Sequence, residues 1–162
     1  MVQNKVRLKI EDVATQLLNN DKLTDYLAFY NFLRNNKMSK TPTSKLKTTW
    51  SFKYKNELVC YLIASENEWS IRYFTNTELF KRVENSLPDE LKELILLNVN
   101  TTPCCKNCNG SDNKLILGKI FNNVCIHRLV VLKNPKGETF EYAKNLVLIC
   151  KKALDDMFAT KA

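Results

Sequence analysis

Three consecutive segments in the first half of the chain carry the pattern of β-strands joined by short turns, and this pattern constrains the fold most. Trp50, Phe52 and Tyr54 alternate with polar residues, which is typical of a strand with one buried face. A nearly continuous apolar run follows over residues 58–64, and residues 69–73 then resume the alternation. Because only short polar stretches separate these segments, we expect an antiparallel meander of three strands.

Helical periodicity lies on both sides of the meander along the chain. Apolar residues recur at three- and four-residue spacing in two stretches of residues 1–36, and Asp21 is expected to cap the second stretch. A longer stripe from Phe140 to Met157 predicts a final helix that begins near Glu138. Helices that flank a largely antiparallel sheet define an α+β fold.

Shorter elements are predicted between the meander and the final helix. Two pairs of residues with capping-box spacing predict two short helices: Thr75 with Glu78, and Ser86 with Asp89. Apolar segments over residues 115–117 and 124–132 predict further strands. Residues 39–44 contain Pro42 and are predicted to form a loop.

The 162 residues correspond to about one domain. We expect an N-terminal helical segment (residues 1–36) and an α+β domain (residues 37–162) to form one compact unit. This unit includes a cysteine-rich segment over residues 101–113, which we call the cysteine loop.

Composition excludes several classes of active site. The three glycines are scattered at positions 110, 118 and 137, and both dinucleotide- and phosphate-binding loops need clustered glycines. The chain has one histidine, His127, and no pair of carboxylates stands out as an acid and a base. We therefore expect a binding protein rather than an enzyme.

The N-terminus offers no apolar stretch typical of a signal peptide, and no later run has the length of a membrane span. These features predict a cytoplasmic protein that does not insert into a membrane. In a reducing compartment the six cysteines are expected to be thiols or metal ligands rather than disulfides.

The most specific motif is the cysteine cluster in the cysteine loop, followed after a short interval by Cys125 and His127. On the predicted strand over residues 124–132, Cys125 and His127 would share one face. Zinc prefers four tetrahedral thiolate or imidazole ligands, so a structural zinc site is expected. Three of its ligands would be Cys108, Cys125 and one member of the adjacent pair Cys104 and Cys105. The fourth would be either the other member of this pair or His127.

Two other interpretations of this cluster remain open. The cysteines could be plain thiols, with Cys125 buried and the others exposed on the loop. They could also form a thiol redox site, although such sites usually place a cysteine at a helix N-terminus and turn-forming residues follow Cys108 here. Cys60 and Cys150 lie in apolar patterns and are expected to behave as small buried hydrophobic residues.

Residues 116–125, preceded by Cys104 and Cys108 and followed by Asn134–Pro135, contain a Leu-Gly-Lys strand and a Val-Cys pair. Together with the tryptophans of the meander, these motifs resemble a group of small bacterial proteins with no established activity. The resemblance spans about residues 48–154 and implies that the meander and the cysteine loop belong to one domain. Members carry a further cysteine where this chain has Thr101, and Cys105 could replace that ligand.

The net charge is +8, and six lysines without an acid lie between Lys37 and Lys55. This stretch could attract nucleic acid, or it could be a solvated loop and strand edge. Cations and aromatic rings on a sheet can also hold a nucleobase or an anionic ligand. The residues considered for such a site are Lys53, Lys55, Trp69, Arg72 and Tyr73.

The sequence therefore predicts a cytoplasmic binding or interaction module with a structural zinc site. Non-specific nucleic-acid binding through residues 37–55 and thiol redox chemistry are the alternatives.

Overall fold

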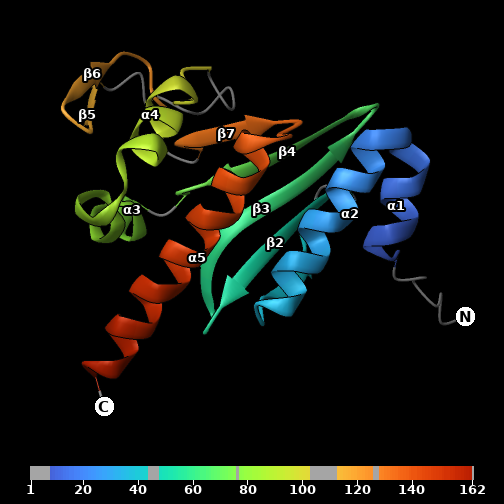
Figure 1. Ribbon diagram of the computed structural model, residues 1–162, viewed down its shortest axis with the longest axis horizontal. Coiled ribbons are helices and arrows are strands. Elements are labelled where there is room, and N and C mark those ends of the chain that lie inside the picture. Colours follow the sequence, from blue (N-terminus) through green and yellow to red (C-terminus); the bar gives the residue numbers. More distant parts are fainter. Residues whose placement is uncertain (1–7, 44–47, 76, 103–112, 126–127, 162) are drawn as a thin grey trace, which may run out of the picture.

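The computed structural model describes residues 8–43, 48–75, 77–102, 113–125 and 128–161. Helices and strands alternate in blocks along the chain, in agreement with the predicted α+β class (Figure 1). The elements are α1 (Ile10–Leu17), α2 (Asn20–Asn35), β1 (Ser39–Pro42), β2 (Thr49–Tyr54), β3 (Glu57–Ser65), β4 (Glu68–Tyr73), α3 (Thr77–Val83), the 3-10 helix η1 (Glu84–Ser86), α4 (Asp89–Leu97), β5 (Lys114–Ile116), β6 (Lys119–Phe121), β7 (Val130–Lys133) and α5 (Glu138–Ala159).

The main sheet has five strands in the order β1-β2-β3-β4-β7, and every neighbouring pair is antiparallel. Its centre is the meander β2-β3-β4, which confirms the prediction from the sequence. Beyond β7, Val99 forms a bridge with Val130, so the chain after α4 runs along the edge of this strand. A separate two-stranded sheet consists of β5 and β6.

Three predicted elements around the meander differ from the structure. Ser39–Pro42 forms strand β1 rather than a loop, because a proline is tolerated in an edge strand where its missing N–H removes no ladder bond. The predicted strand over residues 115–117 is one half of the β5–β6 hairpin, and its turn begins at Leu117. The last strand covers only Val130–Lys133, so Cys125 lies before it and not within it.

Both predicted short helices are present, but their capping differs. Pro88 is the N-cap of α4 and makes no side-chain capping bond, while the hydroxyl of Ser86 donates to the Val83 carbonyl oxygen at 2.9 Å. Asn19, not Asp21, precedes the first turn of α2.

Helices α2 and α5 lie across one face of the main sheet (Figure 1). The Trp69 ring of β4 contacts Tyr26 and Phe29 of α2 and Phe140 of α5, at centroid distances of 5.8, 6.1 and 6.4 Å. The same hydrophobic core includes buried residues of α1, such as Ile10, so the N-terminal helices share the core of the sheet. We call this covered side of the sheet the core face, and the opposite side the outer face.

Candidate functional site

The structure describes one residue of the predicted metal site. Cys125 is 1% exposed, and its backbone N–H donates to the Asn100 carbonyl oxygen at 3.1 Å. The Asn100 N–H in turn donates to the Leu129 carbonyl oxygen at 2.9 Å. The chain that enters the cysteine loop is therefore bonded directly to the chain at Cys125.

The other end of the cysteine loop leads into the β5–β6 hairpin. Lys114 of β5 pairs with Phe121 of β6, and Phe121 lies four residues before Cys125. Both ends of the loop are thus attached to the segment that leads to Cys125. The remaining predicted ligands, Cys104, Cys105, Cys108 and His127, lie outside the described residues.

Cys125 is not on a strand, so the predicted strand position of this residue is wrong. The predicted orientation of His127 lies outside the described residues. Among the described residues, no group of three or more histidine, cysteine or acidic side chains could hold a metal ion.

Two other cysteines are buried in the core and are not candidates for ligands or nucleophiles. Burial raises the pKa of the Cys150 thiol to about 12 and raises that of Cys60 further. A thiol needs its thiolate form to bind metal or attack a disulfide. Cys60 and Cys150 therefore act as small hydrophobic residues, as the sequence predicted.

The β5–β6 hairpin presents apolar side chains to solvent. Leu115 and Ile120 are cross-strand partners and are 71% and 73% exposed. Their neighbour Ile116 points to the opposite side of the hairpin and is buried in the core. The two-residue turn uses positive φ angles at Leu117 and Gly118, as a type I′ hairpin requires.

The five residues considered for ligand binding divide among three environments. Trp69 and Tyr73 are buried on the core face, where the Tyr73 hydroxyl donates to the Ala143 carbonyl oxygen at 2.7 Å. Their predicted role in a ligand-binding surface is therefore wrong, since the helices cover both rings. Lys53 and Arg72 lie on the outer face, and Lys55 lies in the β2–β3 turn.

Tyr61, which the sequence prediction missed, is the aromatic residue between these outer-face cations. It pairs with Ser51 of β2 on one side and with Arg72 of β4 on the other. Tyr61 belongs to an apolar run, which is typical of a strand buried on both faces. The sequence pattern therefore did not predict that Tyr61 is half-exposed.

Lys55 takes part in a cluster with the C-terminal half of α5. Its ammonium lies 2.7 Å from Asp155 Oδ1, which also accepts a hydrogen bond from the Tyr54 hydroxyl at 2.9 Å. The hydrogen bonds from Lys55 and Tyr54 lower the pKa of the Asp155 carboxyl. Lys55 also lies over the Phe158 ring, at 5.4 Å from its centroid.

A hollow of about 530 Å³ lies at the β2–β3 end of the outer face, and we call it the Lys53 hollow. It is lined by Thr43, Ser51, Lys53, Asn56, Glu57, Leu58, Tyr61 and Thr75.

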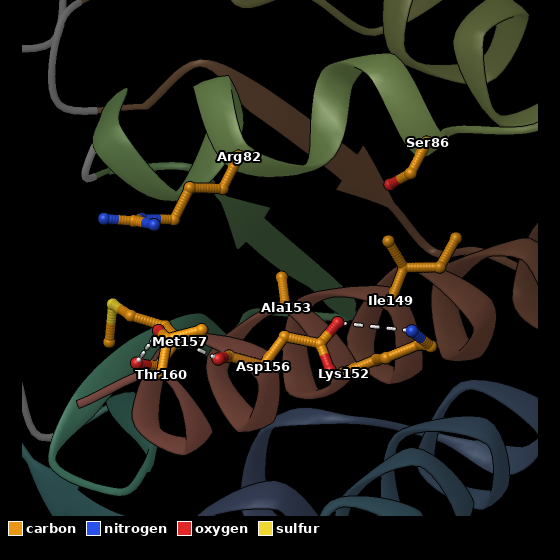
Figure 2. A pocket seen from close by; sticks show the side chains of 8 residues that line it. All are labelled: Arg82, Ser86, Ile149, Lys152, Ala153, Asp156, Met157 and Thr160. Atoms are coloured by element: carbon orange, nitrogen blue, oxygen red, sulfur yellow. Dashed lines mark hydrogen bonds and ion pairs between the residues drawn. The ribbon is translucent and has the colours of Figure 1, made fainter. Parts of the chain in front are cut away.

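A larger hollow of about 700 Å³ separates α3 and η1 from α5 (Figure 2). Most of its polar groups are bonded within their own elements: Lys152 pairs with Asp156 at 3.2 Å, and the Thr160 hydroxyl donates to the Met157 carbonyl oxygen. Ser86 is bonded to Val83 as described above. We therefore regard this space as a gap between helices and the Lys53 hollow as the better candidate for ligand binding.

Comparisons of the chain with protein-family models, with curated proteins and with solved structures found no match. None of the helices in the described part of the chain combines the length and the hydropathy that a membrane crossing requires.

Proposed function

We propose that the protein is an interaction module in which a structural zinc ion fixes residues 101–127 and thereby holds the β5–β6 hairpin in place for a partner. The observation that carries the proposal is the backbone hydrogen bond between Cys125 and Asn100. This bond holds Cys125, a predicted ligand, next to the residue that precedes the cysteine loop.

Chain length supports a common site for the ligands. Cys104 follows Asn100 by four residues, and four extended residues span at most about 14 Å. Cys108 precedes Lys114 by six residues, a reach of at most about 22 Å. Both limits allow the loop cysteines to meet the Cys125 thiol without a change in the described backbone.

The donor set fits a closed tetrahedral site. We assign Cys108 and Cys125, one of the adjacent cysteines Cys104 and Cys105, and either the other adjacent cysteine or His127. Four protein ligands leave no position for a reacting water, so the zinc would be structural rather than catalytic.

The β5–β6 hairpin is the element that a structural metal would stabilise. β5 and β6 have three residues each, and a two-stranded hairpin has little stability apart from its contacts with the core, here at Ile116. Outward Leu115 and Ile120 add exposed apolar area, which is typical of a surface that a partner covers. Zinc would hold this small element in the geometry that the partner requires.

The test is the metal content of protein purified without a histidine tag under reducing conditions. We expect about one zinc per chain by elemental analysis, because a structural site has a fixed set of ligands. Cys108→Ser should lose the zinc and lower the Tm, since metal binding is coupled to folding.

Cys150→Ala is the matched control, because it removes a buried thiol that is not a ligand and should retain the zinc. Metal-free wild-type protein with an unchanged Tm in Cys108→Ser would contradict the proposal. If such protein instead cycles between dithiol and disulfide, the redox alternative takes its place.

A second candidate function, nucleic-acid binding, has one specific observation in its favour. Lysines lie over aromatic rings in a strip along α5 and the β2–β3 turn: Lys151 over Tyr54, and Lys55 and Lys161 over Phe158. Interleaved cations and rings suit phosphates and bases.

The lysine stretch predicted for this role does not form one surface, however. Lys40 lies over the Tyr30 and Trp50 rings, while Lys53 lies on the outer face. Retention on mixed nucleic acid should therefore depend on the strip and fall in Lys151→Gln, but not in Lys53→Gln. Equal retention of the two variants would remove this candidate.

A further inference from the structure

The Lys53 hollow contains two opposite charges that pair with nothing in the described part of the chain. Lys53 and Glu57 are half-buried residues, and neither side chain makes an ion pair or a hydrogen bond with any described residue. They do not pair with each other, although both line this hollow. Glu57, whose strand partner is the core-face residue Tyr54, also lines a second space together with Arg82. By contrast, the neighbouring Lys55 is paired with Asp155.

The neutral polar groups of the hollow are of two kinds. The Tyr61 hydroxyl, the Thr75 hydroxyl and the Asn56 amide have no hydrogen-bond partner among the described residues and could donate to a ligand. The Ser51 hydroxyl donates to the Thr41 carbonyl oxygen at 3.2 Å, which leaves its lone pairs as acceptors. Donors and acceptors are therefore both available beside the two charges.

We propose that the Lys53 hollow binds a small zwitterion of the α-amino acid class. The Lys53 ammonium would bind the ligand carboxylate, and the Glu57 carboxylate would bind the ligand ammonium. A simple anion would meet the uncompensated Glu57, and a simple cation would meet the uncompensated Lys53. Only a ligand with both charges supplies a counter-charge to each group.

The size of the hollow agrees with this ligand class. Small-molecule sites generally measure about 300–1,000 Å³, and this hollow measures about 530 Å³. Leu58 is the aliphatic residue of the lining and offers a contact for an aliphatic part of the ligand.

The experiment is saturation-transfer NMR of the full chain with each standard amino acid in turn. The amino acid that binds is then compared with its deaminated acid and its decarboxylated amine, which keep the side chain and remove one charge each. We expect the zwitterion to bind at least tenfold more tightly than either analogue. Binding should weaken at least tenfold in both Lys53→Gln and Glu57→Gln.

Lys133→Gln is the matched control, because Lys133 lies on the same outer face but on β7, three strands away from β2. It should bind as the wild type does. Circular dichroism and the Tm establish that each variant is folded.

Three results would overturn the proposal: no amino acid binds, the deaminated acid binds as tightly as the amino acid, or binding persists in both variants. The site is independent of the proposed zinc site, and Lys53→Gln should keep its zinc. Failure of one proposal therefore leaves the other intact.

Discussion

Replacement of Trp69 by alanine tests which face of the meander is covered, on which the location of the Lys53 hollow depends. Trp69 is 1% exposed and contacts three aromatic rings of α2 and α5. Its backbone N–H donates to the Asn134 side-chain oxygen at 2.9 Å, and this bond survives the substitution. The loss is therefore one of packing.

Removal of a fully buried tryptophan costs about 3–5 kcal/mol of unfolding free energy. With a urea m-value of about 2 kcal/mol/M, the midpoint should fall by roughly 1.5–2.5 M. Tyr61→Ala is the matched control on the outer face, where the ring is half-exposed and its hydroxyl has no partner among the described residues. It should cost only about 1 kcal/mol.

The assay is urea unfolding followed by circular dichroism at the helix band, because the Trp69 substitution removes a fluorescent probe. If Trp69→Ala costs less than Tyr61→Ala, the assignment of the two faces is inverted. The Lys53 hollow would then lie beneath helices, and the ligand proposal would lose its surface.

Three further predictions concern single contacts. Tyr73→Phe deletes the buried hydroxyl bond to Ala143 and should lower the unfolding free energy by about 1 kcal/mol, measured by urea titration. Gly118→Ala should reduce the stability of the hairpin by about 1 kcal/mol. The cause is backbone strain alone, because the φ of Gly118 is +80° and the new Cβ meets no atom within 4 Å. Faster amide exchange in β5 and β6 would show this loss. Because the pKa of Asp155 is lowered in the folded state, its stabilisation is present above the ordinary carboxyl pKa and is lost as the pH falls through the folded value. In Asp155→Asn the Tm should therefore fall less steeply than in the wild type as the pH is lowered into the acidic range. An equally steep fall of the Tm in the variant would contradict the assigned hydrogen bonds.

Much of the sheet could be predicted because burial on one face imposes alternation. The residues of β4 show this period directly. In β2 the polarity alternates with the same period, although Thr49 and Ser51 are buried as well. Strand β1 could not be predicted in this way, since all its residues are exposed and its register comes from backbone pairing with β2. Strand β6 has only three residues, too few to show a period.

The candidate sites were less predictable, because they depend on which elements cover which face. Alternation in β4 already places Trp69 and Tyr73 on one face of the sheet and Arg72 on the other. The prediction that all three belong to one ligand-binding surface did not take this alternation into account. Lys53 was a correct choice for the outer face, but its unpaired state and the presence of Glu57 follow only from the three-dimensional contacts.

The β2–β3 turn explains how the Lys53 hollow can be preorganised. Lys55 and Asn56 both have positive φ angles, and a lysine adopts this conformation only at a cost in free energy. Asp155 and Phe158 of α5 hold the Lys55 side chain, so a tertiary contact compensates for local strain. Lys53 and Glu57 flank this turn. Contacts with α5 therefore fix the conformation of the turn that joins Lys53 to Glu57.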